Sequence, residues 1–238
     1  MKLKSLLSMF CLASISGGLG CANVSSLQTA RALKPGKSEV AVGGGYFTMP
    51  ALDALLETAA EESMDPDSEG LPTSLPVPYL EVSYRRGLER NMDFGIKLTL
   101  IGTLSADFKY QLIDFNGFAL ATGAGLGAFV VSGDSTTDNS MMDNSMMGDS
   151  MDDSSNLTII DAMIPIYASY DISRAFSLYV SPKYVFRNIN GTPFHLGGLT
   201  GGTRIGQDMG VYLEVSYLQY LENFDIPEIL QFNAAYYF

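Results

Sequence analysis

Histidine, cysteine and tryptophan are almost absent from this sequence. Its 238 residues include one His, two Cys and no Trp. So few imidazole and thiol groups exclude His- or Cys-rich metal sites, zinc fingers and thioredoxin-type redox motifs, and no cofactor is indicated. Bases are also scarce, with 14 Lys and Arg against 26 Asp and Glu, and the net charge of −12 argues against nucleic acid as a partner. After the N-terminus, no run reaches the roughly 18 apolar residues of a membrane helix.

The N-terminus has the organisation of a secretory signal peptide, which we place at residues 1–20. Lys2 and Lys4 form a short positive region, and an apolar run over residues 6–15 follows. Small residues then lead to the expected cleavage site. This segment is therefore left out of the fold. Cleavage of this segment would also remove Cys11, so the mature chain would have no second cysteine for an intramolecular disulfide.

The residues around Cys21 resemble a bacterial lipobox. The motif prefers Leu three residues before the cysteine, whereas Leu19 stands two before it. The resemblance implies a lipid on Cys21 and a periplasmic tether over residues 21–37. Ordinary cleavage nearby, with Cys21 incidental, is the alternative.

Apolar and polar residues alternate through most of residues 38–238. In residues 93–100, for example, Phe94, Ile96 and Leu98 alternate with polar residues or glycine. Successive side chains of a strand point to opposite faces, so such a segment has one apolar and one polar face. A soluble barrel or sandwich hides the apolar face, and a membrane barrel turns it to lipid. Strands of about ten residues favour the membrane barrel, because a tilted strand needs about 9–11 residues to cross a bilayer.

The last strand carries a more specific pattern. Apolar residues recur at every second position from Leu230, and they include Phe232, Tyr236 and the terminal Phe238. This ending resembles the C-terminal signal of bacterial outer-membrane β-barrels. The resemblance implies recognition by the barrel assembly machinery, outer-membrane lipids as surroundings, and an outer-membrane location.

The alternation predicts an all-β fold, an antiparallel up-and-down transmembrane β-barrel of ten strands. We place the strands near residues 38–49, 77–88, 91–102, 103–114, 117–132, 157–171, 174–188, 195–206, 209–221 and 228–238. Short turns alternate with longer connections, which we place at 50–76, 133–156, 188–194 and 222–227. Small barrels have short periplasmic turns and long outer loops, so both ends of the barrel domain fall on the periplasmic side. Eight strands is the alternative, because residues 197–206 are glycine-rich and weak as a strand.

The negative charge is concentrated in two loops. Residues 50–76 and 133–156 together hold 13 of the 26 acids and no Lys or Arg. The rest of the mature chain is nearly neutral. Such acidic loops, next to anionic outer-leaflet lipid, are candidates for shared divalent cations.

Charges of both signs fall on the polar face of the strands, which should line the lumen. They are Glu81, Arg85, Asp93, Lys97, Asp107, Lys109, Lys183, Arg187 and Glu214. Unpaired charges in a narrow lumen would be costly, so we expect salt bridges and a largely plugged interior. A narrow hydrophilic pore lined by the same groups is the alternative.

One loop contains a methionine-rich repeat that could bind metal. Its candidate ligands are Met141, Met142, Met146, Met147, Asp149 and Asp152. Thioethers suit Cu(I) and carboxylates suit Ca²⁺ or Mg²⁺. A low-complexity loop without a metal is the favoured interpretation.

His195 is the only histidine that could act as a catalytic base. It lies near the predicted outer rim, with Glu222 and Asp225 in the next loop. Some outer-membrane barrels are hydrolases that use such a histidine, but no local His–Ser or acidic pair matches them. The alternating Gly123, Gly125 and Gly127 do not form a phosphate loop, because no helix follows them.

The sequence therefore predicts a non-enzymatic outer-membrane barrel with a structural or surface-interaction role. A narrow channel or carrier for small solutes is the first alternative. A barrel enzyme using His195 and a soluble periplasmic lipocalin-like lipoprotein are the others.

Overall fold

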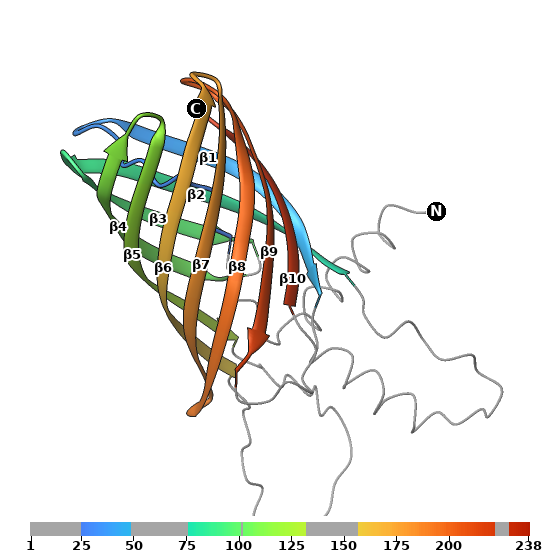
Figure 1. The fold of residues 1–238 in the computed structure, drawn as a ribbon. Helices are drawn as coiled ribbons and strands as arrows, with labels where there is room; N and C mark the ends of the chain where they lie inside the picture. Colours follow the sequence, from blue (N-terminus) through green and yellow to red (C-terminus); the bar gives the residue numbers. More distant parts are fainter. Residues whose placement is uncertain (1–24, 49–75, 101, 132–156, 222–228) are drawn as a thin grey trace, which may run out of the picture.

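Ten antiparallel strands form a closed barrel (Figure 1). The computed structural model describes residues 25–48, 76–100, 102–131, 157–221 and 229–238. The strands are β1 (Ser38–Thr48), β2 (Pro76–Glu89), β3 (Met92–Thr99), β4 (Leu104–Phe115), β5 (Phe118–Val131), β6 (Leu157–Ser173), β7 (Phe176–Ile189), β8 (Thr192–Gly206), β9 (Gly210–Tyr220) and β10 (Ile229–Tyr237). Each strand pairs with its neighbours in sequence, and β1 pairs with β10 to close the sheet. The predicted all-β antiparallel barrel of ten strands is confirmed. Within these described ranges, no helix is long and apolar enough to cross a membrane.

The region from β7 to β8 differs from the prediction. The expected loop at 188–194 is a two-residue turn, in which Asn190 and Gly191 have φ of 48° and 91°. Positive φ at both positions matches the tight turn that Asn-Gly favours between paired strands. β8 then continues through the glycine-rich stretch that looked weak, with every residue from Thr192 to Ile205 paired to β7. Glycines interrupt the apolar alternation there, but they do not interrupt the hydrogen-bonded ladder.

The two ends of the barrel have different connections. The short-turn end carries the connections at 90–91, 116–117, 174–175 and 207–209, together with the start of β1 and the C-terminus. The long-loop end carries the connections after β1, β3, β5, β7 and β9. Both longest predicted loops, 50–76 and 133–156, fall almost wholly outside the described residues.

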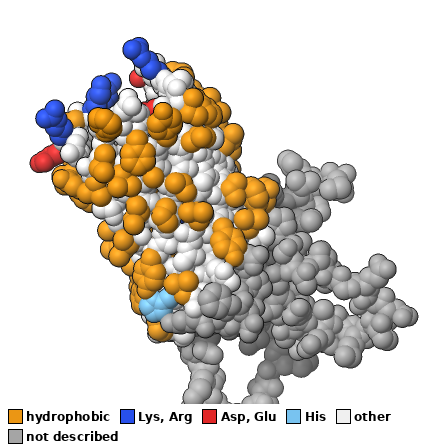
Figure 2. Space-filling model, in the orientation of Figure 1, with side chains coloured by type: hydrophobic (Ala, Val, Ile, Leu, Met, Phe, Trp, Pro, Cys, Tyr) orange, Lys and Arg blue, Asp and Glu red, His pale blue; other side chains and the backbone are white. Residues whose placement is uncertain are grey.

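The outer face of the barrel is apolar. Large hydrophobic side chains with about half of their surface exposed recur on the strands, among them Leu80, Leu98, Leu126, Ile164 and Leu213. Figure 2 shows hydrophobic side chains over the wall, with Lys and Arg gathered at the short-turn end. An apolar outer band is what a membrane barrel presents to lipid.

The interior is polar and is lined on one side by small residues. The buried residues include the charged Glu81, Asp93, Lys109, Arg187 and Glu214. This arrangement is the reverse of the lipocalin-like alternative, which requires an apolar interior. On β5 the inward glycines leave room for neighbours: a Cβ added at Gly125 would lie 3.0 Å from a side-chain carbon of Met163.

The predicted tether at 21–37 differs from the structure over the residues that are described. Residues 25–33, which we call the lumenal segment, lie inside the barrel and hydrogen-bond with side chains of β2, β3, β4, β6, β7 and β9. Five of its residues are less than 9% exposed: Ser25, Ser26, Leu27, Gln28 and Ala30. Residues 34–37 then connect it to β1 at the short-turn end. The sequence interpretation failed here because the segment has no periodic pattern that would mark it as packed.

Candidate functional site

The site is the barrel interior with its lumenal segment. All nine charged residues predicted for the lumen lie on the inner face of their strands. They do not pair only with one another. Several bind main-chain atoms of the lumenal segment, and this second set of partners was not expected.

One cluster of charges joins β2, β3 and β4. Arg85 Nη1 lies 2.5 Å from Asp93 Oδ1, and Arg85 Nη2 lies 2.5 Å from Asp107 Oδ2. Lys109 Nζ lies 3.2 Å from Asp93 Oδ2. Neighbouring strands place these side chains opposite one another, since Asp93 pairs with Lys109 in the register of β3 and β4. The predicted pairing of lumen charges therefore exists here as a network.

A second ion pair joins β6 and β7. Arg187 Nε lies 2.9 Å from Asp161 Oδ1, and both side chains are almost fully buried. Asp161 was missed in the sequence because it sits in the run Ile159 to Ile164, where apolar residues hide the alternation. Its position directly across from Arg187 in the ladder gives the arginine its counter-ion within the wall.

Glu214 on β9 binds the lumenal segment through its carboxylate. The N–H groups of Ser26 and Leu27 donate to its two oxygens at 2.7 and 2.8 Å, and Tyr179 Oη donates at 3.0 Å. Leu27 has a φ of 42°, in the left-handed region. Successive N–H groups beside a left-handed residue form a concave anion site, which here holds a buried carboxylate.

Lysines of the wall bind carbonyl oxygens of the same segment. Lys97 Nζ donates to Ser25 O at 2.5 Å, and Lys109 Nζ donates to Thr29 O at 2.9 Å and to Arg31 O at 2.8 Å. Lys183 Nζ instead reaches a side chain, the Oγ of Ser26, at 3.0 Å. Charge-assisted bonds of this kind are stronger than neutral ones.

Three further N–H groups of the segment are satisfied by wall side chains. Ala30 N–H donates to Ser169 Oγ at 3.2 Å, Ala32 N–H to Gln111 Oε1 at 2.7 Å, and Leu33 N–H to Asp93 Oδ2 at 3.0 Å. Five N–H groups and three carbonyls of the segment are thus bound by side chains of the wall. Buried main-chain polar groups need such partners, and here the barrel supplies them in place of secondary structure.

The segment enters the barrel beside Gly87 of β2. Gly36 N–H donates to Gly87 O at 3.0 Å, and Gly87 N–H donates to Lys37 O at 2.9 Å. A Cβ at Gly87 would overlap the main-chain oxygens of Leu33 and Lys34. Only glycine permits this close approach.

Arg31 fastens the segment at the same end. Its guanidinium lies 2.9 Å from Asp114 and 2.8 Å from Asp171. Both acids are near short turns, so the arginine links two hairpins to the segment. These pairs are partly exposed and should contribute less than the buried ones.

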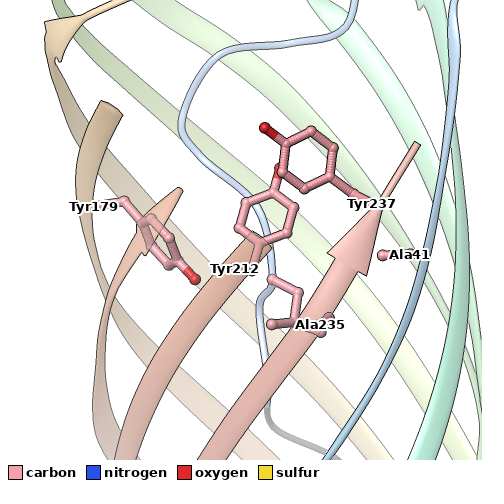
Figure 3. Close-up of a cluster of buried hydrophobic side chains, with 6 residues drawn as sticks. Ala41, Tyr179, Tyr212, Ala235 and Tyr237 are labelled. Atoms are coloured by element: carbon pink, nitrogen blue, oxygen red, sulfur yellow. The ribbon is translucent and has the colours of Figure 1, made fainter. Parts of the chain in front are cut away.

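Leu27 packs in a small apolar cluster inside the barrel (Figure 3). Its neighbours in the cluster are Ala41, Tyr179, Tyr212, Ala235 and Tyr237. Figure 3 shows the tyrosine rings projecting from their strands toward the pale blue chain that runs through the interior. The apolar contact and the Glu214 bonds hold the same turn of the segment.

A cavity of about 580 Å³ lies at the short-turn end, beside the lumenal segment. Charged side chains line it, including Lys34, Lys37, Arg174, Arg204 and Glu39. Arg204 Nη2 lies 3.7 Å from Glu39 Oε2. The cavity is a polar vestibule at the mouth of the barrel.

His195 lies on the outer face, near the long-loop end. It pairs with Phe186 in the ladder, hydrogen-bonds with Tyr184 Oη through Nδ1, and contacts both rings. It is the pale blue patch in Figure 2. Its predicted neighbours Glu222 and Asp225 lie outside the described residues. The surroundings that are described are aromatic.

The residues of the C-terminal signal all lie on β10 or directly after it. Phe232 faces outward and stacks on Tyr46 with ring centroids 5.0 Å apart, and Tyr236 and Phe238 are about half exposed. Cys21 and the loop candidates Met141, Met142, Met146, Met147, Asp149 and Asp152 lie outside the described residues. In the part of the chain that is described, no group of three or more His, Cys, Asp or Glu is placed to hold a metal ion.

Neither a protein-family model nor a curated protein matches this chain. Solved barrel structures are similar to it. The Yersinia pestis outer membrane protein Ail is 9% identical, with 85% of this chain and 100% of Ail covered and a TM-score of 0.32. The outer membrane protease OmpT from Escherichia coli is 10% identical, with 88% and 98% covered and a TM-score of 0.40. The COG4313 outer membrane channel from Pseudomonas putida F1 is 11% identical, with 92% and 98% covered and a TM-score of 0.39.

One of these proteins is a protease and another is a channel, and likeness at this level carries no argument about the role of this chain. The barrel is established by its own strand pairing. Any function must therefore be argued from the residues of the interior and of the outer face.

Proposed function

We propose that the chain is a non-enzymatic outer-membrane barrel whose lumen is closed by its own N-terminal segment, with a structural or surface-interaction role. The observation that carries the proposal is the lumenal segment, bound along its main chain by the wall. An apolar exterior around a charged interior supports insertion in a membrane as a barrel. The aromatic outward setting of His195 favours a non-enzymatic role over a hydrolase built on that residue.

The short-turn end is the periplasmic end in this proposal. Short periplasmic turns and long outer loops are typical of bacterial barrels. The two acidic loops then face the cell exterior, where shared divalent cations would be their partners. The outward-facing aromatic side chains of Phe232, Tyr236 and Phe238 are available to the barrel assembly machinery before the barrel closes.

Two measurements test the proposal. Heat-modifiable mobility of the outer-membrane fraction in SDS gels should reveal a closed membrane barrel. The purified protein in planar lipid bilayers should show no stable single-channel openings. Stable openings of the unmodified protein would contradict the closed lumen.

A narrow channel for small solutes is the second candidate, and the vestibule of about 580 Å³ favours it. It would conduct only after the lumenal segment withdraws. Conductance that appears on addition of a solute, with none before, would support this candidate over a permanently closed barrel.

The lipid on Cys21 remains part of the proposal, and the structure limits the side of the membrane on which it can lie. Ser25 bonds Glu81, which lies eight residues before the short-turn end of β2. Eight residues of a strand tilted by about 40° correspond to a depth of about 20 Å. Four residues join Ser25 to Cys21 and span about 14 Å at most. We therefore expect the start of the mature chain on the long-loop side while the lumenal segment is in place.

Cysteine labelling of intact cells tests on which side of the membrane the start of the mature chain lies. A cysteine introduced by Asn23→Cys should react with a membrane-impermeant maleimide, as should Ser140→Cys in the acidic loop. Arg174→Cys, in a short turn, should react only after permeabilisation. Labelling of Asn23→Cys only after permeabilisation would contradict the expected side and favour a periplasmic anchor.

A further inference from the structure

The lumenal segment is recognised mainly through atoms that every polypeptide has. Its five bound N–H groups and three bound carbonyls belong to the main chain, and the groups that bind them are side chains of four strands, β3, β4, β6 and β9. Side-chain contacts of the segment are fewer: Ser25 with Glu81 and Lys97, Ser26 with Lys183, Gln28 with Tyr167, and Arg31 with two acids.

The binding groups sit on the wall independently of the segment. Glu214, Lys97, Lys109 and Asp93 are on β9, β3, β4 and β3, and each is held in its strand by the ladder. Residues 25–33, in contrast, form no helix or strand of their own. The wall is therefore a preformed surface of donors and acceptors, and the segment is its ligand.

From this we infer that the lumen is a binding site for a polypeptide segment, recognised through its main chain, with residues 25–33 as the resident occupant. The inference rests on the proposed closed lumen and deepens it. The required ligand has free N–H groups at two successive positions, a left-handed residue at the second, and small side chains where Ser25, Ser26 and Ala30 lie. Ala30 is fully buried in a cluster with Ala119, Ala121 and Tyr167, which leaves no room for a larger side chain.

A substitution at Leu27 can release the resident segment without touching the wall. Leu27→Pro removes the N–H that donates to Glu214 and fixes φ near −65°, which is incompatible with the observed 42°. Leu27→Gly loses the same side chain but keeps the N–H and adopts positive φ readily. The two variants thus form a matched pair that differs in main-chain recognition.

The first step of the test is single-channel recording of the full-length protein in planar bilayers. Leu27→Pro should open stably, and Leu27→Gly should be open for at least a tenfold smaller fraction of the time. A Leu27→Pro protein that stays as closed as the unmodified one would overturn the inference, because the segment would then be held by something other than its main chain.

The second step adds the occupant back as a separate molecule. A synthetic peptide with the sequence of residues 25–33 should block the Leu27→Pro openings. The same peptide with an N-methyl group at the Leu27 position should block at least tenfold less well, because it lacks one donor to Glu214. N-methylation at the Thr29 position is the control, since no hydrogen bond of that N–H is found among the described residues, and it should change the block by no more than about twofold.

Equal block by the two methylated peptides, or no block by the parent peptide, would overturn main-chain recognition. Neither result would bear on the closed state of the unmodified protein, which is measured separately. If the unmodified protein itself opens, the closed lumen fails, and the peptide comparison on those openings still decides whether the lumen binds polypeptide.

Discussion

Two buried carboxylates in the same lumen are satisfied in different ways. Asp161 is bound by Arg187 from the neighbouring strand, so its partner belongs to the wall. Glu214 receives the N–H groups of Ser26 and Leu27, so two of its partners belong to the lumenal segment. Asp161 therefore has its counter-ion as soon as the barrel closes. Glu214 gains two of its hydrogen bonds only when the lumenal segment lies inside.

The comparison teaches that the stability of the barrel and occupancy of its lumen are separable properties. Variants at the Asp161 pair should change the first, and variants at the segment contacts should change the second. The free energy of unfolding reports on the wall, and hydrogen exchange of the amides of residues 26 and 27 reports on the segment.

Arg187→Met should have the largest effect, on the wall. It leaves Asp161 buried without its counter-ion, and breaking a buried pair in this way costs about 3–5 kcal/mol. Urea unfolding in lipid vesicles should show this loss. The double variant Asp161→Leu with Arg187→Met is the control and should recover most of it, because an apolar pair replaces both charges. If the single and double variants unfold alike, the loss of stability does not come from leaving Asp161 without its counter-ion.

Glu214→Gln should have the next largest effect, on the segment. The neutral amide keeps one acceptor and turns an NH₂ group toward a donor, so the bonds to Ser26 and Leu27 weaken by roughly 1.5–3 kcal/mol. Exchange of these two amides should accelerate by about tenfold to a hundredfold. The amides of β6 and β7 should exchange as before. Acceleration there as well would show that the stability of the wall depends on the contacts of the lumenal segment.

Gly87→Ala should affect the entry of the segment more than its far end. The added methyl would overlap the oxygens of Leu33 and Lys34, and such overpacking costs about 1–3 kcal/mol. The amides of residues 32 and 33 should exchange faster than those of residues 26 and 27. Gly201→Ala is the matched control, because nothing lies within 4 Å of its added methyl, and it should leave all four amides unchanged.

Period-two alternation made the wall predictable, but it contains no information about which segment occupies the lumen. Lys97, Lys109 and Glu214 were recognisable as inward-facing because apolar residues flank them. Their partners on the lumenal segment were not, because a main-chain N–H has the same appearance in every sequence. Asp161 was hidden in an apolar run, and β8 was underestimated because glycine carries no hydropathic signal. One clue was available: Gly87, an inward glycine of β2, leaves space that the main chain of Leu33 and Lys34 fills in place of a side chain of the wall.

The smallest effect is expected at a wall position remote from the segment, the turn at Asn190. Its φ of 48° is tolerated by Asn and Gly, and its Oδ1 accepts the N–H of Thr158 at 2.8 Å. Asn190→Ala should lower the free energy of unfolding by about 1–2 kcal/mol, because it loses this bond and strains the turn. Asn190→Gly should lose less, since it keeps the backbone conformation. Neither variant should change exchange of the amides of residues 26 and 27; a change there would mean that the wall and the lumenal segment are coupled over the length of the barrel, and that the contrast between Asp161 and Glu214 is local.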